Sequence, residues 1–348
     1  PWYRRIGPGL ITACVVIGPG SIMTSSKVGA TYGYAMNWIV VVAVVFMMVY
    51  TALGAKLGVV AGESPGTLIS RRAGRWLAVI IGVGVFFISA LFQFGNNMGV
   101  HAAFATYFQF DYVIVIFNAL SLAFLFGFKN LYKALERLMM VFVAMMLICF
   151  AVNLALARPN PAELASGFVP SGITTIDISL LGLVGTTFVI SAAFLQPYLV
   201  QQKGWTKSDV KQGLIDARIG ASIMALITLM IVSTSAAIFH NAVTASGQPV
   251  QLGSVADVAQ QLKPLLGESG QFIFCLGLFS AAYSSFLVNS MIGGFILSDG
   301  LGLGSDPHGR WPRILTAVVL LTGMFVAMFV IRKGIQPVGA IVAAQALT

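Results

Sequence analysis

Two apolar segments of this sequence are each interrupted by residues that a membrane helix seldom carries in its middle. The first interruption is Gly-Pro-Gly-Ser at 18–21 and the second is Leu-Gln-Pro-Tyr at 195–198. Proline lacks a backbone N–H and breaks the helical hydrogen bonding, so each interruption frees backbone groups that hydrocarbon cannot satisfy. Such groups must face protein or a cavity, and a pair of interrupted spans predicts a solute site near the bilayer midplane.

The interruptions also carry side chains that could bind a solute directly. These are the hydroxyl of Ser21, the amide of Gln196 and the phenol of Tyr198, which all offer oxygen atoms. We expect the backbone carbonyls of Val15 and Ala193, a few residues before each interruption, to add further acceptors. Either interruption alone would be interpreted as a simple kink, but their matching positions in the two halves favour a site.

The elements that must position these residues are membrane helices. Hydrophobic residues make up 58% of the 348 residues and charged residues only 9%, whereas a soluble domain has about 25% charged residues. The mean hydropathy is +0.91, and apolar runs near the ~20 residues that cross a bilayer recur along the chain. They predict an all-α, multi-pass membrane protein with ten spans at 8–31, 36–61, 77–105, 112–128, 131–157, 179–202, 214–240, 270–297, 312–331 and 335–348.

The distribution of basic residues predicts the orientation and an internal repeat. Lysine and arginine gather at the amino terminus and in the loops that follow the even-numbered spans, such as 71–75 and 203–211. The positive-inside rule therefore predicts a cytoplasmic amino terminus in the cell membrane. Spans one to five (8–157) and six to ten (179–348) then run in opposite directions, which is typical of a five-plus-five inverted repeat within a single domain, 1–348.

Other classes of function have little support in the sequence. The net charge of +9 would suggest nucleic-acid binding in a soluble protein, but here the cations punctuate apolar runs, so we expect the bilayer as partner and no nucleic acid. We find no metalloprotease, phosphate-loop or nucleophile-elbow motif, so an enzyme is not expected and no resident cofactor is predicted. Cys14, Cys149 and Cys275 have no pairing or metal-ligand spacing and are expected to pack in the core. The oligomeric state is not defined by the sequence.

Several stretches resemble the NRAMP family of divalent-metal transporters, from about residue 4 to the end. The stretch Ile-Gly-Pro-Gly-Leu at 6–10, the interruption at 18–21 and Tyr-Gly-Tyr at 32–34 are similar to that family's first helix. Residues 193–198 resemble its sixth helix and 281–285 its eighth. The resemblance implies a LeuT-like fold with broken helices 1 and 6.

The differences from the family pattern concern the metal ligands. Where the family has Asp-Pro-Gly-Asn in the first helix, this chain has Gly18 in place of the aspartate and Ser21 in place of the asparagine. Where the family has Met-Pro-His, this chain has Gln196 and Tyr198. The carboxylate and the soft thioether are thus absent, which favours hard cations over soft ones.

The family's proton path also lacks its acids in this chain. The resemblance places Gln93 and Asn96 at the two carboxylate positions of the third helix, and amides do not titrate near neutral pH. We therefore predict a transporter of divalent cations, hydrated Mg²⁺ first and Mn²⁺ also, that works by alternating access without proton coupling. Gly18 would widen the cavity, and Gln345 of the tenth span would join Ser21, Gln196 and Tyr198 around the hydrated ion.

Two alternatives remain open. The amides at the first interruption, with Gly18, Gly20 and Lys27, would also suit a small anionic or zwitterionic organic solute, although Lys27 is more simply interpreted as a side chain reaching the interface. A sensor that does not transport is the other alternative. Glu63 and Asp216 lie near helix ends and are expected to act as caps or gate residues, and 255–266 is predicted to form a short amphipathic helix.

Overall fold

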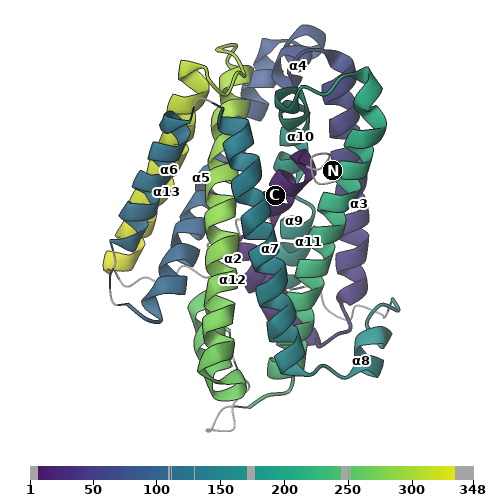
Figure 1. Ribbon diagram of the computed structural model, residues 1–348, viewed down its shortest axis with the longest axis vertical. Coiled ribbons are helices and arrows are strands. Elements are labelled where there is room, and N and C mark those ends of the chain that lie inside the picture. Colours follow the sequence, from purple (N-terminus) through teal and green to yellow (C-terminus); the bar gives the residue numbers. More distant parts are fainter. Residues whose placement is uncertain are drawn as a thin grey trace.

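The computed structural model describes residues 7–108, 110, 112–128, 130–170, 177–243, 250 and 252–333. The elements in these ranges are helices, arranged as an elongated bundle (Figure 1). They are α1 (Pro8–Val16), α2 (Pro19–Tyr32), α3 (Asn37–Ala61), α4 (Pro65–Ala73), α5 (Arg75–Ala105), α6 (Val113–Gly127), α7 (Leu131–Ala157), α8 (Pro161–Ser166), α9 (Ile178–Thr187), α10 (Ile190–Lys203), the 3₁₀ turn η2 (Lys207–Asp209), α11 (Val210–Phe239), α12 (Val255–Gly300) and α13 (Arg310–Lys333).

The predicted membrane spans are present in the described part of the chain. Seven helical segments are long and apolar enough to cross a membrane, and the bent pair α1 and α2 forms an eighth. The apolar helix α6 has 15 residues and coincides with the predicted fourth span. The predicted tenth span, 335–348, lies outside the described residues, and Gln345 lies there with it.

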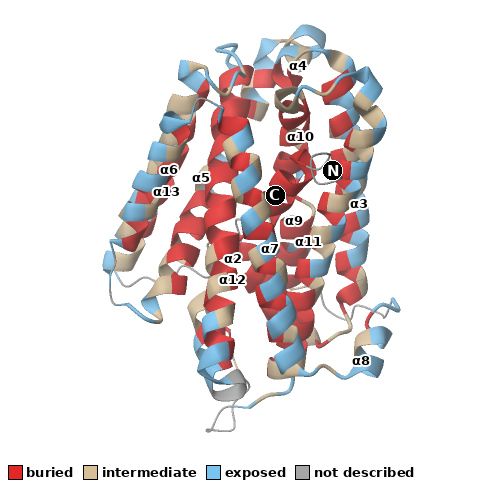
Figure 2. Ribbon diagram, in the orientation of Figure 1, coloured by how far each residue is buried: buried red, intermediate tan, exposed pale blue. Residues whose placement is uncertain are grey.

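Burial follows the pattern of a membrane bundle. Figure 2 shows buried residues gathered along the inside of the bundle and exposed ones on the outward faces of its outer helices. On α3, for example, Met47 and Thr51 are buried, while Phe46 and Leu53 are more than half exposed. Large exposed apolar side chains of this kind mark a surface that water does not cover, which here fits contact with lipid.

The first span is broken where the sequence predicts. α1 ends at Val16 and α2 begins at Pro19, and the two helices meet at an angle of 59°. Pro19 cannot donate a hydrogen bond to the Val15 carbonyl, and the Gly18 amide turns back to the Val16 carbonyl instead. Gly18 itself has extended backbone (φ −116°, ψ −179°).

The sixth span is also broken, but the predicted position is wrong. The break lies at Phe188 and Val189, between α9 and α10, and Pro197 lies inside α10. A proline removes one hydrogen bond, here to the Ala193 carbonyl, and α3 packs so closely against this stretch that the helix continues past it: a Cβ on Gly58 would lie 2.7 Å from the Pro197 Cα.

The last turn of α9 offers a physical reason for the actual break. The hydroxyls of Thr186 and Thr187 donate to the carbonyls of Gly182 and Leu183, four residues earlier. Side-chain bonds of this kind compete with the backbone bonds of the helix and often bend it.

The polar segment before the eighth span begins with a helix, as predicted. Residues 255–266 are helical, and Gly267 with a positive φ of 73° separates them from the long apolar part of α12. A residue with a side chain would be strained in this conformation, so glycine allows the kink here.

Candidate functional site

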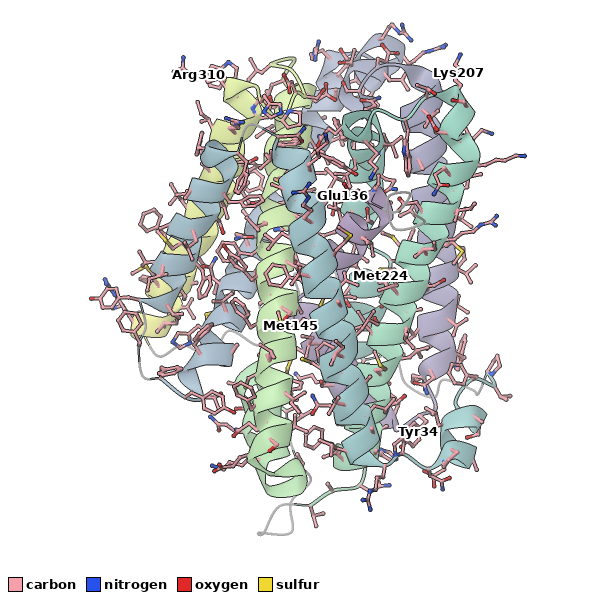
Figure 3. All side chains as sticks on the ribbon, in the orientation of Figure 1. Tyr34, Glu136, Met145, Lys207, Met224 and Arg310 are labelled. Atoms are coloured by element: carbon pink, nitrogen blue, oxygen red, sulfur yellow. The ribbon has the colours of Figure 1, made fainter. Side chains whose placement is uncertain are left out.

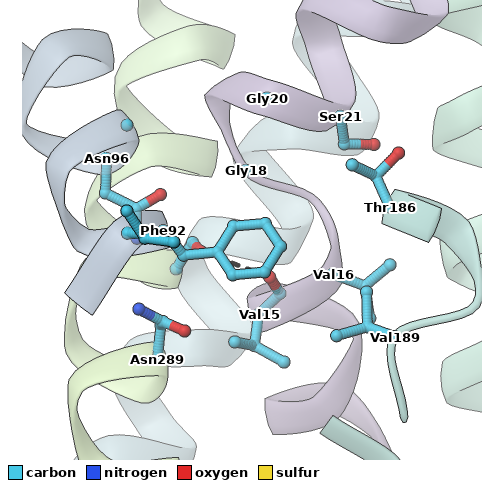
Figure 4. Close-up of a pocket in the computed structure, with 13 residues that line it drawn as sticks. Val15, Val16, Gly18, Gly20, Ser21, Phe92, Asn96, Thr186, Val189 and Asn289 are labelled. Atoms are coloured by element: carbon cyan, nitrogen blue, oxygen red, sulfur yellow. Dashed lines mark hydrogen bonds between the residues drawn. The ribbon is translucent and has the colours of Figure 1, made fainter. Parts of the chain in front are cut away.

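A small cavity lies at the break of the first span, between α1, α2, α5, α9 and α12 (Figure 4). Its polar lining comes from five side chains on four helices: Ser21, Asn96, Thr186, Ser285 and Asn289. In the view of Figure 4, Asn96 and Asn289 lie on one side and Ser21 and Thr186 on the other. The break thus brings together hydroxyl and amide groups from distant parts of the chain.

Four of the residues predicted for the site or for the former proton path line this cavity: Val15, Gly18, Ser21 and Asn96. The Ser285 hydroxyl donates to the Val15 carbonyl at 3.2 Å, which satisfies one acceptor freed by Pro19. The Ser21 hydroxyl is buried and has no hydrogen-bond partner among the described residues. A buried polar atom without a partner is uncommon, and here it can bind a solute or its water.

Gln196 and Ala193 do not line the cavity, contrary to expectation. Gln196 is fully buried, and its Oε1 accepts a hydrogen bond of 2.6 Å from the Thr12 hydroxyl of α1, while its Nε2 has no partner in the part of the chain that the structure describes. The Ala193 carbonyl faces α3 at Gly54. Because the break lies at 188–189, Gln196 is about 10 Å further along α10, at 1.5 Å per residue.

Tyr198 is still further from the break, and its role differs from the predicted one. Its hydroxyl donates to Asp299 Oδ2 at 2.6 Å, at the end of the bundle where α4 lies (Figure 1). The prediction of Tyr198 as an ion ligand assumed a break at 195–198. With the helix continuous through Pro197, the side chain meets the end of α12 rather than the cavity.

The wide chamber expected from Gly18 is not present in this conformation. A Cβ on Gly18 would lie 3.1 Å from Ser285 Oγ and 3.3 Å from Asn96 Oδ1, so these two side chains occupy the space beside the glycine. The cavity has a volume of about 20 Å³, which is near the space that one water molecule needs.

The lining is neutral. It contains no titratable side chain among the described residues, and no group of three His, Cys, Asp or Glu in the described part of the chain could hold a metal ion. Carbonyl, amide and hydroxyl oxygens suit hard cations or their bound waters, whereas they do not select soft ones.

Buried formal charge is negative in the described part of the chain. Among the described residues, the buried charged ones are Asp216 and Asp299. Asp216 accepts hydrogen bonds from the backbone amides of Gly7 and Gly9, at 2.8 and 2.6 Å, and thereby caps α1. This confirms the expected capping role of Asp216, since a carboxylate at a helix start satisfies free amides and complements the helix dipole.

The two residues that the resemblance places on the family's proton path, Gln93 and Asn96, form part of an amide network. Asn96 Nδ2 donates to Gln93 Oε1 at 3.4 Å, and Asn97 Nδ2 donates to the Gln93 carbonyl at 2.8 Å. Asn118 of α6 in turn donates to Asn97 Oδ1 at 2.8 Å. Gln93 does not line the cavity but packs against Gly323 of α13. Each of these groups is an uncharged amide.

Three polar lining residues, Thr186, Ser285 and Asn289, were not predicted from the sequence. Ser285 and Asn289 stand four residues apart in an apolar helix and therefore share a face, a spacing that could have indicated them. Thr186 could be found only with the true position of the sixth-span break.

Comparisons with known proteins agree with this geometry. The family model Nramp, described as natural resistance-associated macrophage protein-like, matches residues 9–348. The divalent metal cation transporter MntH of Chromohalobacter salexigens is 28% identical over 99% of this chain and 80% of its own length, and that of Deinococcus radiodurans is 26% identical over 98% and 77%. A crystal structure of the Eremococcus coleocola manganese transporter covers 99% of this chain and 74% of its own, with a TM-score of 0.81 and 19% identity. The structural likeness establishes the LeuT-like fold.

Proposed function

The chain belongs to the Nramp family, and from that premise we propose that it is a secondary transporter for hydrated divalent cations, Mg²⁺ first and Mn²⁺ also, working by alternating access without proton coupling. The observation that carries the proposal is the neutral, oxygen-lined cavity at the break between α1 and α2. Related chains are named as divalent metal cation transporters, which supports a cation as the solute.

The ligand chemistry favours a hard ion that retains water. Mg²⁺ dehydrates reluctantly and is usually bound through several of its own waters. Oxygens that can accept from such waters are offered by five lining side chains: Ser21, Asn96, Thr186, Ser285 and Asn289. Among the described lining residues, none contributes a thioether or a thiol. Mn²⁺ prefers similar oxygen ligands.

Because the cavity is small in this conformation, alternating access must widen it before a hydrated ion can enter. A hydrated ion is larger than the space of one water that this conformation offers. Entry therefore requires Asn96 of α5 and Ser285 of α12 to move apart from Gly18. A rearrangement of α1 and α2 against α5 and α12 would widen the cavity.

The side chains present support transport without protons. Neither Gln93 nor Asn96 can release a proton near neutral pH, and the described lining of the cavity adds no acid. The membrane potential alone can drive entry, since two charges crossing 100 mV gain roughly 4.6 kcal/mol.

The arrangement of cations supports the predicted orientation. In Figure 3, Lys207 and Arg310 lie at the same end of the bundle as α4, whose last turn carries Arg71 and Arg72. By the positive-inside rule this end faces the cytoplasm, and the cavity lies between it and the outer end near α8.

The alternative solute, a small organic anion or zwitterion, is less compatible with the buried charges. Asp216 and Asp299 place two carboxylates in the interior, which disfavour an anion and favour a cation. The start of α2, with Gly20 and Ser21, nevertheless lines the cavity, and the first amides of a helix have no partner within the helix, so organic solutes belong in the test.

Uptake into proteoliposomes tests the proposal. Purified protein should admit Mg²⁺ and Mn²⁺ under an inside-negative potential and should not admit amino acids or small carboxylates. Replacement of Ser285 by alanine should reduce the uptake, because it removes a lining oxygen. Uptake of Cd²⁺ alone would contradict the proposed preference, and uptake of an organic solute would favour the alternative.

A further inference from the structure

The two ends of the bundle differ in how tightly they are closed. Near α8, a cavity of about 630 Å³ opens between the ends of α2, α9 and α11, lined by Lys27, Ala30, Ser179 and His240 among others. At the α4 end, buried polar contacts join several helices instead. Figure 3 shows Tyr34 at the end near α8, where the large cavity opens, and Glu136 toward the closed end, where α4 lies.

Asp299 is the centre of the contacts at the closed end. It is 2% exposed and stands one residue before the end of α12. Its Oδ1 accepts from the hydroxyls of Ser64, at 2.7 Å, and Thr67, at 3.1 Å. Its Oδ2 accepts from the Gly66 amide, at 2.8 Å, and the Tyr198 hydroxyl, at 2.6 Å.

The donors to this carboxylate in the described part of the chain are neutral, so no ion pair holds it. A charged acceptor strengthens each of these hydrogen bonds relative to a neutral pair. The carboxylate also lies at the start of α4, where it satisfies a free amide and complements the helix dipole. The site is fitted closely around the carboxylate, since a Cβ on Gly66 would lie 2.5 Å from Asp299 Oδ2.

Tyr198 differs from the other donors because it comes from a half-helix of a broken span. Ser64, Gly66 and Thr67 belong to the start of α4, whereas Tyr198 is on α10. α10 is tied in turn to α1 by the Thr12–Gln196 hydrogen bond. The two half-helices on the α4 side of the breaks therefore form one linked unit.

We propose that the Tyr198–Asp299 hydrogen bond is a latch that holds α10, and with it α1, against α12 and so keeps the α4 end closed. Opening of this end requires α1 and α10 to move away from α12, and the Tyr198 hydroxyl must then leave the carboxylate. Tyr198 is a gating residue rather than an ion ligand. The proposal rests on the alternating access proposed above but not on the identity of the ion.

Two single-cysteine reporters measure the state of each end. Cys14 of α1 is fully buried, and its thiol contacts the Met139 carbonyl of α7 at 3.7 Å, so it reacts only when α1 leaves α7. In the first reporter the other two cysteines are replaced (Cys149→Ala and Cys275→Ala), so that Cys14 is the one cysteine left. The second reporter adds Ala30→Cys, in the cavity of the opposite end, to a chain in which Cys14, Cys149 and Cys275 are all replaced by alanine.

The experiment compares maleimide labelling rates in lipid nanodiscs without any transported ion. Tyr198→Phe removes only the hydroxyl, and loss of a hydrogen bond to a charged group should shift the equilibrium on the order of tenfold. We expect faster labelling of Cys14 and slower labelling at position 30. A merely loosened protein would label faster at both positions.

Tyr132→Phe is the matched control. Tyr132 is a buried tyrosine on α7 whose hydroxyl has no hydrogen-bond partner within the described ranges, so its replacement should change neither rate by more than about twofold. The latch would be overturned if the two variants had equal effects, or if Tyr198→Phe had none. Faster labelling at both reporters would also overturn it. Should Tyr198→Phe not accumulate, Ser64→Ala removes another donor to the same carboxylate and must shift the two reporters in the same opposite directions.

Failure of the latch and failure of the proposed function are distinguishable. Uptake of Mg²⁺ with unchanged labelling would exclude the latch alone. Opposite shifts of the two reporters in a protein that admits no divalent cation would support the latch and exclude the proposed substrate.

Discussion

Gly18 and Asn96 are in close contact across the break of the first span: a Cβ on Gly18 would lie 3.3 Å from Asn96 Oδ1. The space beside Gly18 is thus occupied by the amide of Asn96 from α5 and by the hydroxyl of Ser285 from α12. Neutral oxygens from neighbouring helices therefore lie where the resemblance expects the family's aspartate.

This contact predicts that Gly18→Ala impairs transport without straining the backbone. The extended conformation of Gly18 is open to any residue, so the effect should come from the Cβ pressing on Ser285 and Asn96. We expect uptake to fall about tenfold, the kinetic equivalent of roughly 1.4 kcal/mol, with little change in thermal stability. A variant as active as the parent would contradict a cavity at Gly18.

Ser285→Ala should weaken cation uptake more than Ser290→Ala does. Ser285 lines the cavity and donates to the Val15 carbonyl, whereas the equally buried Ser290 donates to Leu287 of its own helix. Initial uptake rates over a range of Mg²⁺ concentrations compare the two. We expect a raised KM for Ser285→Ala alone, and equal values would place the ion elsewhere.

Gln196→Leu should leave the equilibrium affinity for the ion unchanged, although it breaks the Thr12–Gln196 bond that ties α1 to α10. The side chain does not line the cavity, and the variant also removes a buried Nε2 that has no partner among the described residues, which is nearly neutral for stability or favours it. Thr12 keeps its bond to the Pro8 carbonyl. Thermal unfolding and equilibrium binding of Mn²⁺ test this prediction, and a lost ion affinity in a folded protein would assign Gln196 to the site after all.

Asp216→Asn should destabilise the protein by about 1–3 kcal/mol, the cost of leaving a buried donor unsatisfied. The two amides of Gly7 and Gly9 need two acceptor oxygens, and the asparagine offers only one. Thermal unfolding in detergent measures the change. An unchanged transition would mean that the carboxylate contributes little to the start of α1.

The sequence predicts the fold better than the site. Apolar runs and basic loops locate the described spans, and proline beside glycine marks the break at 18–21. Pro197 marks no break, because close packing of α3 against α10 supports the helix through it. The true break at 188–189 contains neither proline nor glycine, so local sequence gives only a weak signal for it.

The displaced second break explains why only some of the predicted residues meet at the cavity. Val15, Gly18 and Ser21 line it because the first break lies where the sequence predicts, and their contact with the ion stays a prediction. Gln196 and Tyr198 were assigned to the cavity on the assumption of a break beside them, and a helix rise of 1.5 Å per residue moves both away from it. Ser285 and Asn289 meet the break only through tertiary packing of α12.

Uncoupled transport predicts that Mg²⁺ entry leaves the internal pH unchanged. Proteoliposomes that carry a pH-sensitive dye and a potassium-set, inside-negative potential provide the measurement. The amides of Gln93 and Asn96 cannot carry protons, so acidification should match protein-free liposomes. Acidification that rises with Mg²⁺ uptake would refute the absence of coupling.

The most direct test of a neutral cavity for a hard, hydrated cation is competition in a single uptake assay. Mg²⁺ uptake into proteoliposomes is measured with Mn²⁺, Cd²⁺ or an amino-acid mixture added outside. We predict that Mn²⁺ reduces the Mg²⁺ signal strongly, while Cd²⁺ reduces it weakly and amino acids not at all. No Mg²⁺ uptake, with Cd²⁺ or an amino acid as the transported species, would contradict the proposed function.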